Sequence, residues 1–480
     1  MGLSTILSSK ISFSFANQSL NVKKNINFIN KRPLTDEKYA TTYNNYYEFG
    51  SSKNIWRSAQ KLSTDPWKIT IDGLVEKKIE IDKSLDGKES LLISQLHPNQ
   101  NLLIVSDQFT HKALGSRIYK NLQGKVKADE YIWESPSSSI EGVEFLRKKI
   151  KDYDGVIAVG SGTVSDSIKY ATFLEKKSYS VFATTPMNAY TTGTASISFD
   201  GIKKSLVAHY AQGVFFDLEV LSMCPKRLTA AAFADVICRT TAQVDWLMSH
   251  KILKTDYQTA PYSLLALYEK DMIESASLIA KGDIEALALL TRISAIMGLG
   301  TSFTQTTHVG SMGEHGISHY IDMFAKDNHP GTSHGEQVGI ATISISKIQN
   351  SILNKDTPPI IKPTQIPEQE IIQKLGHQML DTIHDAMKTK IFDEKRAEMI
   401  NNFFHKNWLE FVQPLREKML DYDIIWNSMG ECGALRTPED AKLDSNFYKD
   451  ALRYARFIRD RYTILDLAGD SNQLDGLINV

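Results

Sequence analysis

The stretch Gly155-Val156-Ile157-Ala158-Val159-Gly160-Ser161-Gly162-Thr163 decides the fold of the N-terminal half of the chain. Its first part is a continuous apolar run, which is typical of a strand buried on both faces of a parallel sheet. Glycines then allow a tight turn and a close approach to a ligand, and a following helix would present unpaired N–H groups to phosphate. The stretch therefore predicts a strand, a turn that binds a dinucleotide pyrophosphate, and a helix. A turn without a ligand is the alternative.

This turn departs from the usual dinucleotide fingerprint GxGxxG, because Ser165 stands at the position of the third glycine. A second cue is Asp107, which follows the apolar run Leu102-Leu103-Ile104-Val105 and Ser106. An acid at the carboxyl end of a strand lies where open parallel sheets bind nucleotides. Asp107 is therefore a candidate for nucleotide contact, and a helix-capping role is the alternative.

Similar apolar runs occur on both sides of this stretch and alternate with amphipathic segments, at residues 102–105, 180–183 and 214–216. This alternation predicts a parallel sheet that is covered by helices on both faces. After about Leu221 the strand pattern ends. Apolar residues then recur at helical spacing, most clearly in residues 228–250, 285–297 and 393–419.

These patterns predict an N-terminal Rossmann-like α/β domain that binds a nucleotide, at residues 61–220, and an all-α C-terminal domain that binds a metal, at residues 221–480. The proline-rich residues 354–367 are predicted to form a surface loop in the second domain. Residues 1–60 are interpreted as a polar N-terminal extension. No acid precedes Asp36, but the basic residues are nearly all lysine, which disfavours the alternative of an organelle transit segment.

Composition narrows the class of protein. The 480 residues carry a net charge of -1, so no strong attraction to nucleic acid or to an anionic membrane is expected. The three cysteines, Cys224, Cys238 and Cys432, are few and odd in number, which favours free thiols in a reducing compartment such as the cytoplasm. The most apolar segment, residues 284–303, contains Glu285 and Arg292 and is expected to be a buried helix rather than a membrane span.

Three elements that lie far apart in the sequence supply metal-binding side chains. Asp235 lies among apolar residues of the predicted helix 228–250, where a carboxylate is costly to bury unless a cation pairs with it. Four of the twelve histidines fall in one short segment, namely His315, His319, His329 and His334. Two imidazoles and one carboxylate leave an open coordination position, which is typical of a catalytic zinc or iron. We therefore predict a metal site at Asp235, His315 and His334, with hydrogen-bonded core histidines as the alternative.

Two other segments supply cationic side chains. Arg239 follows Asp235 by one helical turn and is predicted to lie beside that carboxylate or to bind a substrate phosphate. Pairing with an acid such as Glu314 is the alternative for Arg239. Lys203 and Lys204 follow Asp200-Gly201, which is predicted to be a hairpin turn, and they are expected to be solvated.

Taken together, the motifs resemble the superfamily of iron-containing alcohol dehydrogenases and dehydroquinate synthases, and within it the sn-glycerol-1-phosphate dehydrogenase branch. The resemblance extends over about Leu102 to Leu467. Its motifs, in order, are Gly160-Ser-Gly-Thr-Val-Ser-Asp166, Thr184-Thr-Pro-Met-Asn188-Ala-Tyr190, Phe216-Asp217-Leu218, Ala234-Asp235, Gly313-Glu-His315-Gly-Ile-Ser-His319, His334-Gly-Glu-Gln-Val-Gly339 and Arg459-Asp-Arg461-Tyr-Thr-Ile-Leu-Asp-Leu-Ala468.

The resemblance implies a dehydroquinate synthase-like fold with the active site in the cleft between the two domains. It implies metal ligands Asp235, His315 and His334, with zinc favoured and iron or nickel as alternatives, and His319 nearby. NAD or NADP is the implied cofactor, and phospholipid metabolism the implied context. The implied nucleotide contacts are Asp107 at the adenosine end, Gly160, Ser161, Gly162, Thr163 and Asp166 at the pyrophosphate and ribose, and Thr184, Thr185 and Tyr190 at the nicotinamide end.

One departure from the branch concerns the substrate. Better-known members carry an Asp-Gly pair that orients substrate hydroxyls, whereas this chain has Asn188-Ala189. Asn188 can still donate and accept hydrogen bonds, but it lacks the charge. The predicted catalytic set is His319 as a proton relay, Arg239 and Asn188, acting on a small polyol phosphate such as dihydroxyacetone phosphate. For His319 the alternative is a residue that only orients the groups around the metal.

Two alternative functions are a dehydroquinate synthase-like lyase and a nucleotide-binding homologue without catalysis. The lyase is disfavoured because the His315 motif lacks that family's Asn-x-Gly-His pattern and because the first ligand is Asp rather than Glu. The non-catalytic homologue is disfavoured because a decayed site has no need of three ligands. A homo-oligomer is compatible with the sequence, and neither nucleic acid nor a membrane span is expected.

Overall fold

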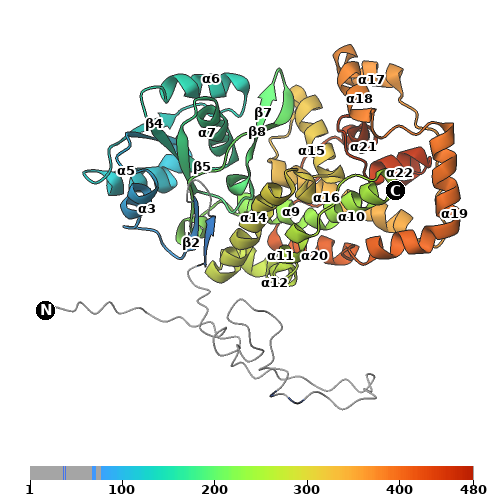
Figure 1. Ribbon diagram of the computed structural model, residues 1–480, viewed down its shortest axis with the longest axis horizontal. Helices are drawn as coiled ribbons and strands as arrows, with labels where there is room; N and C mark the ends of the chain where they lie inside the picture. Colours follow the sequence, from blue (N-terminus) through green and yellow to red (C-terminus); the bar gives the residue numbers. More distant parts are fainter. Residues whose placement is uncertain (1–35, 37, 39–66, 72–76, 479–480) are drawn as a thin grey trace. The chain divides into compact units, whose positions relative to one another are not determined.

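The computed structural model describes residues 36, 38, 67–71 and 77–478 (Figure 1). Asp65–Val480 forms one compact unit, and the features below belong to it. The polar extension predicted for residues 1–60 lies, apart from Asp36 and Lys38, outside the described residues.

The N-terminal part is built on a seven-stranded sheet of order β1-β2-β9-β6-β5-β3-β4. All neighbouring strands are parallel except β1 and β2. The four predicted apolar runs are confirmed as its adjacent central strands β9, β6, β5 and β3. The strands that the sequence missed, β1, β2 and β4, lie toward the edges and mix polar with apolar residues. The bounds are β1 (Trp67–Ile71), β2 (Lys77–Asp82), β3 (Leu102–Asp107), β4 (Ala128–Trp133), β5 (Gly155–Gly160), β6 (Ser178–Ala183) and β9 (Gly213–Asp217).

Helices cover both faces of this sheet, as predicted (Figure 1). Alternate residues of each strand point to opposite faces. Leu102 and Ile104 of β3 therefore pack with α3 and α5, whereas Leu103 and Val105 pack with α6 and α7. The connecting helices are α3 (Glu89–Leu96), α4 (Gln108–Thr110), a π-helical turn η2 (His111–Gly115), α5 (Ser116–Leu122), α6 (Ile140–Lys149), α7 (Gly162–Leu174), η3 (Ala189–Thr191) and α8 (Leu218–Ser222).

A separate hairpin extends from this part and carries polar residues. It consists of β7 (Thr194–Phe199) and β8 (Ile202–Val207), which pair in antiparallel fashion. The turn at Asp200-Gly201 is confirmed, with φ angles of 48° and 80°. Positive φ at both central residues is the geometry that two-residue hairpin turns require.

Beyond Asp217 the described residues contain helices and no further strand, as the loss of strand pattern predicts. The segment 354–367 is confirmed as a connection without regular structure. The helices are α9 (Lys226–Ile237), α10 (Arg239–Leu253), α11 (Ala260–Leu265), α12 (Glu269–Glu274), α13 (Ala276–Lys281), α14 (Ile284–Thr304), η4 (His308–Gly310), α15 (Gly313–Phe324), η5 (Lys326–Asn328), α16 (His334–Leu353), α17 (Glu368–Leu375), η6 (His377–Met379), α18 (Leu380–Met387), α19 (Glu394–Arg416), α20 (Tyr422–Cys432), α21 (Ser445–Tyr454), η7 (Ala455–Phe457), α22 (Ile464–Asp470) and α23 (Leu474–Ile478).

One helix prediction was wrong in detail. The single helix expected over residues 228–250 is interrupted at Cys238, which separates α9 from α10. The thiol of Cys238 donates to the carbonyl of Asp235 and to that of Gly310 on a neighbouring segment. Tertiary contacts of this kind hold the break and are not visible as apolar periodicity in the sequence.

Among the described helices, α14 is long and apolar enough to cross a membrane by length and composition alone. Of its most apolar window, 67% is buried inside the protein. Leu287, Leu290 and Ile293 belong to the core that α14 shares with the sheet and with α9. This packing is what the sequence predicts for a core helix, and the feature is weak support for a membrane span.

In the helical part, α16 packs closely against α9. A Cβ at Gly335 would lie 2.3 Å from the carbonyl oxygen of Ala231, and one at Gly339 would lie 2.8 Å from the Cβ of Ala234. Two glycines four residues apart on α16 thus face small residues of α9. This contact brings His334, at the start of α16, toward Asp235 on α9.

We predict that Gly335→Ala lowers the free energy of unfolding by at least about 1–3 kcal/mol, because its methyl group would collide with a backbone carbonyl. Urea unfolding followed by circular dichroism measures the change. Gly316→Ala in α15 is the matched control, because its Cβ would meet nothing closer than 3.6 Å. Equal unfolding midpoints for Gly335→Ala and wild type would contradict the close helix contact.

Candidate active site

A cavity of about 450 Å³ lies where the sheet, the hairpin and the helical part meet. Its lining includes three groups of residues that carry polar side chains or free backbone groups. The first comes from the N-terminus of α7 (Ser161, Gly162 and Thr163), the second from the hairpin (Ser196, Lys203 and Ser205), and the third from the helical part (Asp235, His315, His319 and His334). The cavity therefore brings the predicted phosphate turn and the predicted metal ligands to one site.

Asp235 is 6% exposed and holds its carboxylate between two partners. Its Oδ2 accepts a hydrogen bond of 2.9 Å from Asn188 Nδ2. Its Oδ1 lies 3.7 Å from His315 Nε2 and has no hydrogen-bond partner. Burial raises the pKa of Asp235, while the His315 charge and the Asn188 hydrogen bond act in the opposite direction. A buried carboxylate oxygen without a partner is an incomplete arrangement that a cation would complete.

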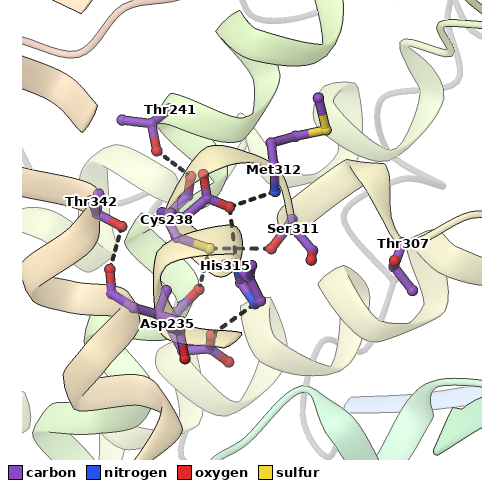
Figure 2. Close-up of polar contacts among 12 residues, drawn as sticks. Asp235, Cys238, Thr241, Thr307, Ser311, Met312, His315 and Thr342 are labelled. Carbon is purple, nitrogen blue, oxygen red and sulfur yellow. Dashed lines mark hydrogen bonds and ion pairs between the residues drawn. The ribbon is translucent and has the colours of Figure 1, made fainter. Parts of the chain in front are cut away.

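His315 is oriented by the residue that precedes it. Its Nδ1 lies 3.0 Å from Glu314 Oε1, which also accepts the backbone N–H of Met312 (Figure 2). Because the Nδ1 proton points to Glu314, the Nε2 lone pair faces Asp235. A carboxylate that fixes the imidazole in this way is the usual support of a metal-binding histidine.

His334 is held by a longer chain of hydrogen bonds. Gln337 Nε2 donates to Asp322 Oδ1 at 2.9 Å, so Gln337 Oε1 accepts the Ser318 hydroxyl proton at 2.7 Å. Ser318 Oγ can then only accept from His334 Nδ1, which lies 3.0 Å away. The His334 Nε2 is thereby left with a lone pair, and the rings of His315 and His334 are 4.9 Å apart between centroids.

The chain of hydrogen bonds that holds His334 ends at Lys203, which was predicted from the sequence to be solvated. Lys203 on β8 forms an ion pair of 2.7 Å with Asp322 Oδ2 and lines the cavity. Together with burial, which is the largest effect, the Lys203 charge lowers the pKa of both His334 and His319 well below the usual range. This direction favours the neutral form of both imidazoles.

Cys238 is a third potential ligand near Asp235 and His315 that sequence reasoning missed (Figure 2). The potential ligand atoms of these three residues lie within 4.8 Å of one another, and this grouping does not include the predicted ligand His334. However, the Cys238 thiol donates to the carbonyls of Asp235 and Gly310, and burial raises its pKa well above the usual range. A protonated thiol is a poor ligand. All three cysteines of the chain are free.

The glycine turn is formed as predicted. Ser161 is the N-cap of α7 and makes no capping hydrogen bond, and Ser161, Gly162 and Thr163 all line the cavity. At Gly160 there is no room for a side chain, because a Cβ would lie 2.8 Å from that of Val164. Asp166 also lines the cavity, but its carboxylate is engaged by Lys169 at 3.4 Å and by the Ser196 N–H at 3.1 Å.

The residues predicted at the two ends of the nucleotide are placed differently. Thr185 lines the cavity, whereas Tyr190 is 1% exposed and donates from its hydroxyl to the Gly160 carbonyl at 2.8 Å. Tyr190 thus supports the glycine turn from behind, and Thr184 is buried beside it. Asp107 follows Ser106, the partner of Val159, at the carboxyl ends of β3 and β5. It lies outside the cavity, and its carboxylate caps α4.

Of the three predicted catalytic residues, His319 and Asn188 line the cavity and Arg239 does not. His319 lines the cavity, and no hydrogen bond to its ring is found among the described residues. Asn188 lines it too, but its amide is used to hold Asp235. Arg239 lies outside the cavity, is 3% exposed and pairs with Glu269 of α12 rather than with Asp235 or Glu314. The break at Cys238 removes the simple helical relation on which the Arg239 prediction depended.

The chain is similar in sequence to a family of dehydrogenases. The family model described as iron-containing alcohol dehydrogenase matches residues 80–225. The glycerol-1-phosphate dehydrogenase [NAD(P)+] of Pyrococcus abyssi is 30% identical over 271 residues, which cover 56% of this chain and 77% of that protein. The chain belongs to the glycerol-1-phosphate dehydrogenase branch of the iron-containing alcohol dehydrogenases.

Two other known proteins match more of the chain. The glycerol-1-phosphate dehydrogenase [NAD(P)+] of Bacillus velezensis is 24% identical over 416 residues, or 84% of this chain and 95% of that protein. The solved glycerol dehydrogenase of Schizosaccharomyces pombe covers 86% of this chain and 92% of its own, with a TM-score of 0.55 and 14% identity. The α/β and all-α fold class predicted from the sequence is confirmed.

We predict that Ser318→Ala weakens divalent metal binding by about 10- to 100-fold, because the His334 imidazole loses the partner that fixes its proton on Nδ1. Competition with a fluorescent chelator measures the affinity. Ser428→Ala, on the buried face of α20, is the matched control. Unchanged affinity in Ser318→Ala would show that the hydrogen-bond chain does not serve a metal at His334.

Proposed function

We propose that this glycerol-1-phosphate dehydrogenase-like chain is a metal-dependent, NAD(P)-linked oxidoreductase that interconverts dihydroxyacetone phosphate and sn-glycerol 1-phosphate. One observation carries the proposal: a single cavity combines the free N-terminus of α7 with Asp235, His315 and His334. The names of the relatives support the nicotinamide cofactor and the substrate class. Cytoplasmic location is part of the same proposal.

The residues fit one divalent metal ion. Asp235 Oδ1 lacks a partner, and the hydrogen bonds of His315 and His334 leave each Nε2 free to coordinate. One carboxylate and two imidazoles, with room for substrate, are the donor set of catalytic zinc and of non-haem iron. Zinc is the metal we favour, with iron and nickel as alternatives, and Cys238 stays a thiol outside the coordination sphere.

The glycine turn fits the pyrophosphate of a dinucleotide. Backbone N–H groups at the start of α7 and the Ser161 hydroxyl are available to phosphate oxygens, and Gly162 keeps the approach open. Tyr190 and Thr185 hold the Gly160 carbonyl in place, with Thr185 Oγ1 lying 2.8 Å from the Tyr190 hydroxyl. Asp107, beside Gly160, is proposed for the adenosine end, where both NAD and NADP are allowed.

A metal held by Asp235, His315 and His334 would supply a Lewis acid for the substrate carbonyl, and a nicotinamide bound at the α7 turn would supply the hydride. Asn188 keeps Asp235 oriented, and Glu314 and Ser318 keep the two imidazoles in the coordinating tautomer. Burial lowers the pKa of His319 well below its usual range, which disfavours an imidazolium as the proton source. A neutral imidazole can accept a proton at one nitrogen while releasing one from the other, and this is the relay we assign to His319.

Purified protein is expected to oxidise NADH or NADPH with dihydroxyacetone phosphate, and complete metal removal by a chelator is expected to abolish the reaction. Zinc, iron or nickel should restore it, because each accepts the same donor set. Net consumption of reduced cofactor is the measurement, since a dehydroquinate synthase-like lyase recycles its nicotinamide.

His315→Ala tests the residue behind this effect, and His405→Ala at an exposed position of α19 is its matched control. Activity should be lost in the first variant and kept in the second. Activity that survives full metal removal would contradict the proposed function, as would wild-type activity in His315→Ala.

A further inference from the structure

Two arginines of the C-terminal segment reach the cavity wall from behind. Arg459 and Arg461 follow η7 and precede α22. Arg459 Nη1 donates to Ser311 Oγ at 3.0 Å, and Arg461 Nη2 donates to Thr307 Oγ1 at 2.5 Å. Arg461 Nη1 also contacts the Ser311 carbonyl. Thr307 and Ser311 line the same cavity as His315, and Figure 2 shows them on one side of that residue.

The hydroxyl groups of Thr307 and Ser311 can each still donate one hydrogen bond. A hydroxyl has one proton to donate, and here its oxygen already accepts a guanidinium N–H. Within residues 77–478, no hydrogen bond has Thr307 Oγ1 or Ser311 Oγ as donor. Both protons are therefore available to an acceptor in the cavity, and both hydroxyls are polarised by a cation.

Among the described residues, no carboxylate pairs directly with either arginine, although Asp460 and Glu314 lie near enough to attract both charges. Neither guanidinium lies within 4 Å of a carboxylate in the described part of the chain, and Arg461 Nε is buried without a hydrogen-bond partner. The neighbouring Arg456, in contrast, pairs with Asp466 and Asp470. Two adjacent unpaired cations at a buried wall are costly unless an anion binds nearby.

The positive charges of Arg459 and Arg461 also affect the pKa values of groups around them. Burial lowers the pKa of Arg461 well below its usual range, and the adjacent Arg459 charge adds to the effect. The same two charges contribute to a pKa of about 2 at His308, where burial is the largest cause. Lys203, the other cation at the cavity, is already paired with Asp322.

We propose that Thr307 and Ser311, backed by Arg459 and Arg461, bind the phosphate group of a phosphate-monoester substrate. This rests on the proposed function and deepens it, because it assigns the group that distinguishes a polyol phosphate from a free polyol. The pyrophosphate of the nucleotide has its own place at α7, on the sheet side of the cavity. Thr307 and Ser311 are binding residues, whereas Arg459 and Arg461 are positioning residues that act through the hydroxyls.

The first test compares two substrates in the metal-loaded enzyme. The double variant Thr307→Val with Ser311→Ala removes both donors and leaves the arginines in place. It is expected to lose at least about tenfold in kcat/KM for dihydroxyacetone phosphate, mainly through KM, with little change for dihydroxyacetone. Ser428→Ala serves as the control. An equal loss for both substrates would overturn the assignment, because it would show a structural effect.

The second test reads binding without catalysis. Inorganic phosphate is titrated calorimetrically into metal-loaded protein that lacks nucleotide, using wild type, the double variant, Arg459→Gln and Arg461→Gln. At least about tenfold weaker binding is expected in each variant, with partial recovery in Arg461→Lys, which keeps the charge but not the two-pronged contact. Arg453→Gln is the matched control, because this arginine of α21 pairs with Asp475 and does not line the cavity.

The two tests separate this inference from the function on which it rests. Equal phosphate affinity in wild type and in all variants would overturn the phosphate site, even in an active dehydrogenase. Phosphate binding that depends on these residues would support the site, even if no polyol phosphate is turned over and the proposed function fails.

Discussion

The structure depends on the close contact between α9 and α16. Asp235 and His334 lie about a hundred residues apart in the sequence, and only the absence of side chains at Gly335 and Gly339 lets their helices meet. Larger residues at these positions would separate a buried carboxylate from an imidazole. The helix contact therefore acts first on packing and, through packing, on the donor set of the proposed metal site.

A second level of organisation is electrostatic. The cavity wall contains more polar groups than it can satisfy internally, and the imbalance differs from one end to the other. Near Asp235 a carboxylate oxygen lacks a partner, which suits a cation, whereas near Ser311 two guanidiniums lack a carboxylate, which suits an anion. A substrate with a polarisable carbonyl at one end and a phosphate at the other would match both ends.

The sequence predicts those features that depend on local pattern. Continuous apolar runs identified β3, β5, β6 and β9, and Gly160 to Gly162 identified the turn before α7. Edge strands such as β4 were missed because their residues are neither continuously apolar nor strictly alternating, so they match neither strand pattern. Arg239 was misplaced, and Lys203 and Cys238 were undervalued, because their partners Glu269, Asp322 and Gly310 come from segments that no spacing rule connects. The absence of a capping hydrogen bond at Ser161 is likewise visible only in the structure.

The measurement that most directly tests the central claim is X-ray absorption spectroscopy of the protein loaded with one equivalent of zinc. The account predicts a first shell of nitrogen and oxygen at about 2.0–2.2 Å, from Asp235, His315, His334 and solvent or substrate. Sulfur scattering at about 2.3 Å would show that Cys238 binds the metal as a thiolate and would contradict the ligand set described above.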